Sequence, residues 1–146
     1  MIVFIGCGKK KNIVTCEAYK MYQGNYFSTC LQYAKTLTSE DNIFILSAKY
    51  GVLHLHDIIT PYNITLNEAT QEQYKEWTQK VLRQLNDLNI NSDTEITFLC
   101  GKNYYKELLP YFKKVNLPLE QYSGMGYQIS FMKKQIYKSR PSLFNI

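Results

Sequence analysis

The segment Ile2-Val-Phe-Ile-Gly-Cys-Gly8 decides the fold of this chain. Its run of β-branched and aromatic residues, followed directly by glycine, is typical of a buried parallel strand that ends in a tight loop. Working outward, the same signature recurs at Ile43–Leu46 and at Ile96–Leu99, and each run again leads into a polar turn. Segments in which apolar residues recur with helical spacing separate these runs. The sequence therefore predicts parallel strands joined by crossover helices.

Four segments have the apolar spacing of helices. They are Tyr26–Leu37, Thr70–Leu88, a segment after Lys102 with Tyr105, Leu108, Leu109 and Phe112 on its inner face, and a last one after Gly126 with Ile129, Met132 and Ile136. A fourth strand is expected within Val115–Tyr122, whereas Val52–Leu66 has no sustained period and is expected to be an irregular connection. The prediction is an α/β fold, a three-layer α/β/α sandwich with a four-stranded parallel sheet, forming one domain over residues 1–146.

Composition narrows the class of protein. The hydrophobic 45% is dispersed among charges, without the run of about 18 apolar residues that a membrane span needs. The N-terminus is apolar and lacks a basic leader, so we expect a cytoplasmic protein with no membrane partner. A net charge of +5 and 13 tyrosines favour a polyanionic, base-containing partner, although such a charge is also common in proteins without one.

The four cysteines, Cys7, Cys16, Cys30 and Cys100, form no Cys-x-x-Cys pair and are expected to be free thiols. A cluster held by all four is the alternative, because Cys7 and Cys100 both follow predicted strands. No motif points to a cofactor. His54 and His56 resemble metal ligands only superficially, since no third ligand follows at a suitable spacing, so we predict no metal site.

Four loops should meet at one edge of the sheet, because the carboxyl ends of parallel strands lie together and ligands of open α/β sheets bind there. These loops are Cys7–Lys11, Ser47–Gly51, Gly101–Lys102 and Gly124–Gly126. The residues predicted to bind nucleic acid or a base are Cys7, Gly8, Lys9, Lys10, Ser47, Lys49, Tyr50, Tyr62, Lys102 and Gly126.

The lysines of the first loop are candidates for phosphate contacts. Gly6-Cys-Gly-Lys-Lys-Lys11 lacks the spacing of a P-loop and the third glycine of a dinucleotide fingerprint, so a nucleoside triphosphate site is not expected. A glycine turn instead lets backbone amides approach an anion, with lysines as point charges. A solvated lysine run is the alternative.

Tyr50 and Tyr62 are candidate stacking platforms for a base, with Lys49 meeting its phosphate. A simple hairpin turn would explain Gly51 alone. The spacing around Ser47 is neither that of Ser-x-x-Lys enzymes nor that of a nucleophile elbow, so a serine nucleophile is not predicted.

Asp57 and Asn63 are the candidate catalytic residues. Asp57 is the acid in the connection between Tyr50 and Pro61, and an ionised carboxylate near a sugar can stabilise an oxocarbenium-like transition state or orient water. An Asx turn or a salt bridge is its alternative role. Asn63 can read a base edge with paired donor and acceptor, or can cap a turn.

The chain resembles a family of small bacterial and phage domains grouped near the peroxide-stress YaaA proteins. The resemblance rests on Cys7–Lys11, Ala18–Tyr22, Leu46–Leu53, Pro61–Leu66, Phe98–Lys102 and Gly124–Gly126. That family is similar in fold to uracil-DNA glycosylases and to some anti-phage DNA glycosylases, which implies a uracil-DNA-glycosylase-like sheet and excision of a modified base. The chain lacks the Gly-Gln-Asp-Pro-Tyr and His-Pro-Ser motifs of the standard uracil enzymes.

Together these features predict a DNA glycosylase that flips out a modified base, such as a hypermodified phage base, and cleaves its N-glycosidic bond, with a role in antiviral defence. Two alternatives stay open. A non-catalytic nucleic-acid-binding module needs the lysines and tyrosines but not Asp57. A hydrolase of free nucleosides or nucleotides would act on small molecules instead of DNA.

Overall fold

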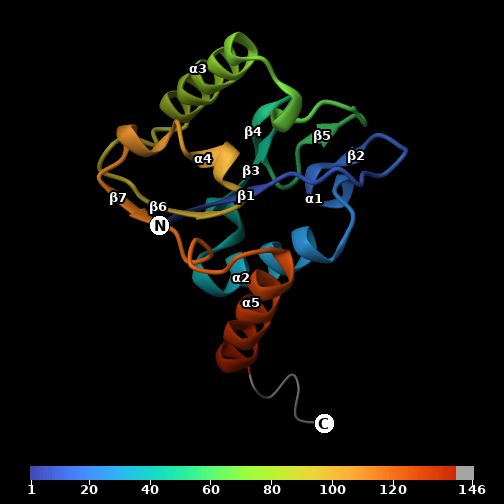
Figure 1. Ribbon diagram of the computed structural model, residues 1–146, viewed down its shortest axis with the longest axis vertical. Coiled ribbons are helices and arrows are strands. Elements are labelled where there is room, and N and C mark those ends of the chain that lie inside the picture. The colour runs from blue at the N-terminus through green and yellow to red at the C-terminus, as the bar shows by residue number, and fades with distance from the viewer. Residues whose placement is uncertain (141–146) are drawn as a thin grey trace.

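The computed structural model describes residues 1–140 and has a central five-stranded sheet with strand order β4-β3-β1-β6-β7 (Figure 1). The strands are β1 (Ile2–Gly6), β3 (Ile43–Ser47), β4 (Gly51–His54), β6 (Glu95–Leu99) and β7 (Lys114–Asn116). β1 runs parallel to β3 and to β6, β6 runs parallel to β7, and β4 is antiparallel to β3. The expected α/β fold is therefore confirmed, and the sheet is parallel except for β4.

Side chains of the central strands alternate between two hydrophobic cores. Val3 and Ile5 of β1 pack into one core, and Phe4 between them packs into the other, where its ring lies against Phe98 and Phe44 with centroids 5.5 and 6.0 Å apart. Because both faces of β1 are covered, its sequence is continuously apolar rather than alternating.

Helices cover both faces of the sheet. α2 (Asn25–Leu37) and α5 (Met125–Ser139) pack on one face, and α3 (Gln71–Asp87) and α4 (Lys102–Tyr105) on the other (Figure 1). α3 begins where predicted, because Thr70 and Gln73 form a reciprocal capping box. Short elements complete the described chain: α1 (Ala18–Met21) and 3-10 turns at Glu40–Asn42, Leu66–Glu68 and Leu109–Tyr111. Within residues 1–140, no helix has the length and apolar character needed to cross a membrane.

The expected count of four strands is wrong, because the segment predicted to be an irregular connection contains β4. This strand forms a hairpin with β3 and pairs Leu46 with Val52. Val52 and Leu53 are both buried, so β4 shows no alternation of apolar and polar residues that would reveal a strand. Farther on, β5 (Ile58–Ile59) pairs with β2 (Cys16–Glu17) in a separate antiparallel ribbon.

One helix is shorter than predicted and the fourth strand is short, and a proline lies close to the end of each. Pro110 has no N–H and its ring clashes with the preceding turn, so α4 stops at Tyr105 and the 3-10 turn Leu109–Tyr111 follows. The strand expected within Val115–Tyr122 is β7, which starts at Lys114 and ends at Asn116, two residues before Pro118.

The order of the strands reverses beside β1. The chain passes from β1 through α2 to β3 on one side, and later through α3 to β6 on the other side of β1. The helices that follow β1 and β6 therefore lie on opposite faces of the sheet, which leaves a crevice at the carboxyl ends of these two strands.

Candidate functional site

The crevice between the ends of β1 and β6 holds a cavity of about 790 Å³. We call it the β1–β6 pocket. Four segments line it: the loop after β1, the start of α2, the start of α4 with the loop before it, and the start of α5, while the segment from Ile64 to Asn67 closes one side. Its volume is in the range of about 300–1,000 Å³ typical of ligand sites.

Lysines give the β1–β6 pocket a positive lining. Lys9, Lys10, Lys11 and Lys102 border it, and none of its lining residues is Asp or Glu. No ion pair joins these lysines to a carboxylate in the part of the chain that the structure describes. The Lys11 ammonium lies 4.6 Å from the centroid of the Tyr62 ring, while Lys9, Lys10 and Lys102 are exposed. The pocket therefore has a net positive charge suited to an anion.

Cys7 and Tyr104 both line the pocket and contact each other. The Cys7 sulfur and the Tyr104 hydroxyl are 3.0 Å apart and hydrogen bonded, and burial followed by the neighbouring Cys7 raises the pKa of Tyr104. Gly6 allows β1 and β6 to approach closely here, since a Cβ at residue 6 would lie 2.8 Å from Cys100 Cβ. The loop after β1 is further held by the hydrogen bond from Gln23 N–H to the Lys10 carbonyl, 2.8 Å long.

Aromatic side chains and an amide form the walls. Tyr26 donates its hydroxyl hydrogen to Gln128 Oε1, and Gln128 Nε2 donates to the carbonyls of Leu119 and Tyr122, so α2 and α5 are joined across the pocket. Burial raises the pKa of Tyr26, which keeps it a donor at neutral pH. On the opposite side, Thr65 Oγ1 is buried and has no hydrogen-bond partner among residues 1–140.

Ser47 and Tyr62 are predicted site residues that instead form a buried cluster beside the pocket. The Tyr62 hydroxyl is 2.8 Å from Ser47 Oγ and 2.7 Å from the Tyr22 hydroxyl. Burial, together with the nearby Cys7, raises the pKa of Tyr62, and burial raises the pKa of Tyr22 to about 12. Three hydroxyls in one hydrogen-bonded set hold the Tyr62 ring in place, and Tyr62 is not among the residues that line the β1–β6 pocket.

Lys49 and Tyr50 lie in the β3–β4 hairpin and do not line the β1–β6 pocket. The Lys49 ammonium lies 5.3 Å from the Tyr50 ring centroid, and the Tyr50 hydroxyl is 2.9 Å from Thr60 Oγ1. Gly51 therefore lies in a hairpin turn, which is the alternative interpretation of this segment. The Lys49 and Tyr50 side chains contact each other and Thr60.

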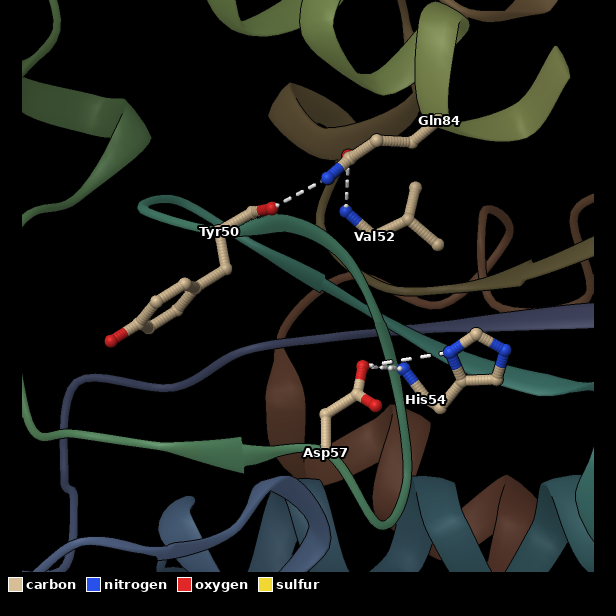
Figure 2. A network of polar contacts seen from close by, with 5 residues as sticks. All are labelled: Tyr50, Val52, His54, Asp57 and Gln84. Carbon is tan, nitrogen blue, oxygen red and sulfur yellow. Dashed lines mark hydrogen bonds and ion pairs between the residues drawn. The ribbon is translucent and has the colours of Figure 1, made fainter. Parts of the chain in front are cut away.

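The structure does not bring Asp57 or Asn63 to the pocket. Asp57 Oδ2 accepts a 2.9 Å hydrogen bond from the His54 amide and lies 3.5 Å from His54 Nδ1, which closes the turn between β4 and β5 (Figure 2). Asn63 is exposed and is not among the lining residues, unlike its neighbours Ile64 and Thr65. The geometry thus gives Asp57 the turn-forming role that was the alternative to catalysis.

Replacing Asp57 with Asn should leave DNA affinity and any base release unchanged. An amide oxygen can still accept from the His54 amide, and the lost ion pair joins two side chains that are half exposed, so stability should change by less than about 0.5 kcal/mol. The checks are a base-release assay and urea unfolding of the variant. A large loss of base release, with an unchanged free energy of unfolding, would mean that Asp57 takes part in catalysis.

The remaining predicted residues divide between the pocket and its surroundings. Cys7, Gly8, Lys9, Lys10 and Lys102 line the pocket together, whereas Gly126 does not and its place is taken by Gly124 and Met125. All four cysteines are free. His56 contacts Glu17, with 2.5 Å between Nδ1 and Oε2, and residues 1–140 hold no group of three or more His, Cys, Asp or Glu side chains that could bind a metal.

Several lining residues are not among those that the sequence predicts. They are Asn25, Tyr26, Phe27, Thr65, Asn103, Tyr104 and Gln128. The apolar spacing assigns Tyr26 and Phe27 to the buried face of a helix, which hides their position in its first turn. The available signal is a preceding glycine: Tyr26 and Phe27 follow Gly24 at the start of α2, and Tyr104 follows Gly101 after β6.

One comparison with known proteins bears on this arrangement. Residues 2–134 match the model of a family of unknown function, DUF6884, which spans β1 through most of α5. The chain belongs to this family. Every residue that lines the β1–β6 pocket, from Gly6 to Ile129, lies inside the DUF6884 match. The pocket is thus part of the family domain itself.

Proposed function

We propose that this DUF6884 protein binds a nucleotide unit of DNA in the β1–β6 pocket and cleaves the N-glycosidic bond of a modified base. One observation carries the proposal: four lysines, and no carboxylate, line a single large cavity beside aromatic rings at the switch in strand order. Phosphates, a sugar and a base match that lining in charge and in aromatic character.

Phosphate binding is supported by backbone as well as side-chain charge. α2 and α5 both start at the pocket after a glycine, Gly24 and Gly124, which has no side chain to cap the first-turn amides. Unpaired N–H groups and the helix dipole favour an anion at such ends. With Lys9, Lys10 and Lys102 nearby, a polyanion such as DNA would be bound in a strongly salt-dependent manner.

Base binding is supported by the rings on the walls. Tyr26 and Tyr104 line the pocket from different elements. Stacking on such a ring contributes about 1–3 kcal/mol per base. That is comparable to the few kcal/mol needed to extrude a nucleotide from a duplex.

The proposed reaction is hydrolysis at the anomeric carbon. The C1′–N bond breaks with both electrons leaving on the base, a water oxygen attacks C1′, and the proton released by water ends on the base or in solvent. Lysines and amide donors would stabilise the leaving base as negative charge develops. Asn25, Asn67 and Asn103 line the pocket and could hold the water. The anion facing the sugar cation would be the phosphate of the DNA.

A second candidate is a non-catalytic nucleic-acid-binding module. The same lining favours it, because none of the residues lining the pocket is a carboxylate that could act on the sugar. The two candidates share the prediction of salt-dependent DNA binding and differ in whether an abasic site forms.

The deciding experiment incubates the protein with DNA that carries natural or hypermodified bases. The products are screened for free base by mass spectrometry and for abasic sites by alkaline strand cleavage. We expect the wild-type protein to release a modified base, and we expect no release by the double variant Lys9→Ala, Lys102→Ala. Binding without release across the substrate panel would support the binding module, and absence of both would contradict both candidates.

A further inference from the structure

A second, smaller cavity adjoins the β1–β6 pocket on the side of β7. Its volume is about 290 Å³, and it shares Cys100, Gly101, Lys102 and Gln128 with the larger pocket. The four shared residues place the two cavities side by side. Two of the residues that line only the smaller cavity, Tyr105 and Glu120, carry polar groups.

Tyr105 has a fixed ring and an unpaired hydroxyl. The side chain is only 7% exposed, and its ring stacks on Phe98 with centroids 5.5 Å apart and an angle of 29° between the planes. The hydroxyl has no hydrogen-bond partner among residues 1–140. Because the ring is already held in place, a ligand group that accepts the hydroxyl hydrogen would gain a hydrogen bond at little cost in side-chain ordering.

Glu120 gives this cavity the carboxylate that the larger pocket lacks. It lies in the loop between β7 and α5, and its carboxylate has no ion-pair or hydrogen-bond partner in the described chain. Its charge acts on Tyr105, because burial first and then Glu120 raise the pKa of that phenol. A tyrosine hydroxyl is protonated at neutral pH and can donate, whereas the Glu120 carboxylate beside it only accepts.

We propose that the smaller cavity reads the edge of the bound base and selects a base with an amino group. Glu120 accepts from the amino group, and the Tyr105 hydroxyl donates to the adjacent ring nitrogen. Cytosine and adenine present this pair, whereas uracil and hypoxanthine place a carbonyl oxygen where the amino group would be, facing the carboxylate. The inference rests on the proposed function, since it concerns the base of the same nucleotide.

The test compares single-stranded DNA homopolymers of equal length that differ in whether the base carries an amino group. Deoxycytidine and deoxyuridine polymers have the same backbone, so phosphate contacts contribute alike and the difference in affinity reports the base edge. We expect the wild-type protein to prefer the deoxycytidine polymer by about tenfold in fluorescence anisotropy. Glu120→Gln should remove the preference, because an amide can also donate to a carbonyl, and Tyr105→Phe should reduce it.

Glu76→Gln is the matched control, since it removes the same charge from an exposed residue of α3 away from both cavities. It should keep the wild-type preference. Salt-dependent binding with equal affinity for the two polymers, or a preference that persists in Glu120→Gln, would overturn the assignment of Glu120 and leave the proposed function intact. Failure of the wild-type protein to bind either polymer would overturn the proposed function itself, and this inference with it.

Discussion

Replacing both Lys9 and Lys102 with alanine should weaken DNA binding by about 60-fold at about 0.1 M salt. Each lysine that neutralises a phosphate releases about one counterion, so its loss lowers affinity by about eightfold under those conditions. The two lysines lie on opposite sides of the strand switch, one after β1 and one after β6, and both line the pocket. Fluorescence anisotropy over a salt series should show the slope of log affinity against log salt falling by about two.

Lys133 and Lys134 provide the control for this loss of charge. Both are exposed on α5 and neither lines the pocket, so their double alanine variant has the same net charge as the pocket variant. It should lose no more than about threefold, through the long-range field alone. Equal losses in the two variants would mean that DNA responds to overall charge, and the pocket would not be the binding site.

Replacing Gly51 with alanine should destabilise the fold by about 3 kcal/mol. Gly51 starts β4 at a φ of +75°, a conformation that costs other residues about 1–2 kcal/mol. A Cβ there would also lie 2.2 Å from Gln84 Oε1. Gln84 accepts from the Val52 amide at 2.8 Å and donates to the Tyr50 carbonyl at 3.0 Å (Figure 2), and losing both bonds adds about 1 kcal/mol each.

The check is the free energy of unfolding in urea, with Gly8→Ala as the control. A Cβ added at Gly8 would meet no atom within 4 Å beyond its chain neighbours, and Gly8 has no positive φ, so its variant should be close to wild type in stability. In a Gln84→Ala background, Gly51→Ala should cost only the backbone strain of about 1–2 kcal/mol. A cost that is the same in both backgrounds would mean that the Gln84 bridge does not hold the hairpin.

The central strands and long helices could be predicted because their signals are local. Ile2–Ile5 and Ile43–Leu46 are continuous apolar runs, as expected for parallel strands that are covered on both faces. Thr70 and Gln73 form a capping box that can be recognised from the sequence. β4 could not be predicted, because Val52 and Leu53 are both buried and show no alternation, and its pairing with β3 exists only once the hairpin forms. Pro110, in contrast, is a local signal that limits α4 and can be read from the sequence.

The candidate site shows the same division. Lys9, Lys10 and Lys102 could be assigned to one edge because each follows a strand end, and parallel strands place such ends together. The position of Asp57 between Tyr50 and Pro61 predicts that it belongs to the site. Nearness along the chain, however, does not fix on which side of a turn a carboxylate lies. In the folded chain, Asp57 accepts a hydrogen bond from the His54 amide, and this bond fixes the position of the carboxylate.

By itself the sequence determined the α/β class, the parallel strands and the lysines at their ends, because these follow from residue type, period and strand direction. Only the tertiary structure decided which rings line the β1–β6 pocket. Tyr62 is hydrogen bonded to Tyr22 and Ser47 and does not line the pocket, whereas Tyr26 and Tyr104 line it. The physical reason is that exposure and hydrogen-bond pairing depend on neighbours far apart in the chain, such as Cys7 and Tyr104, which no local pattern connects.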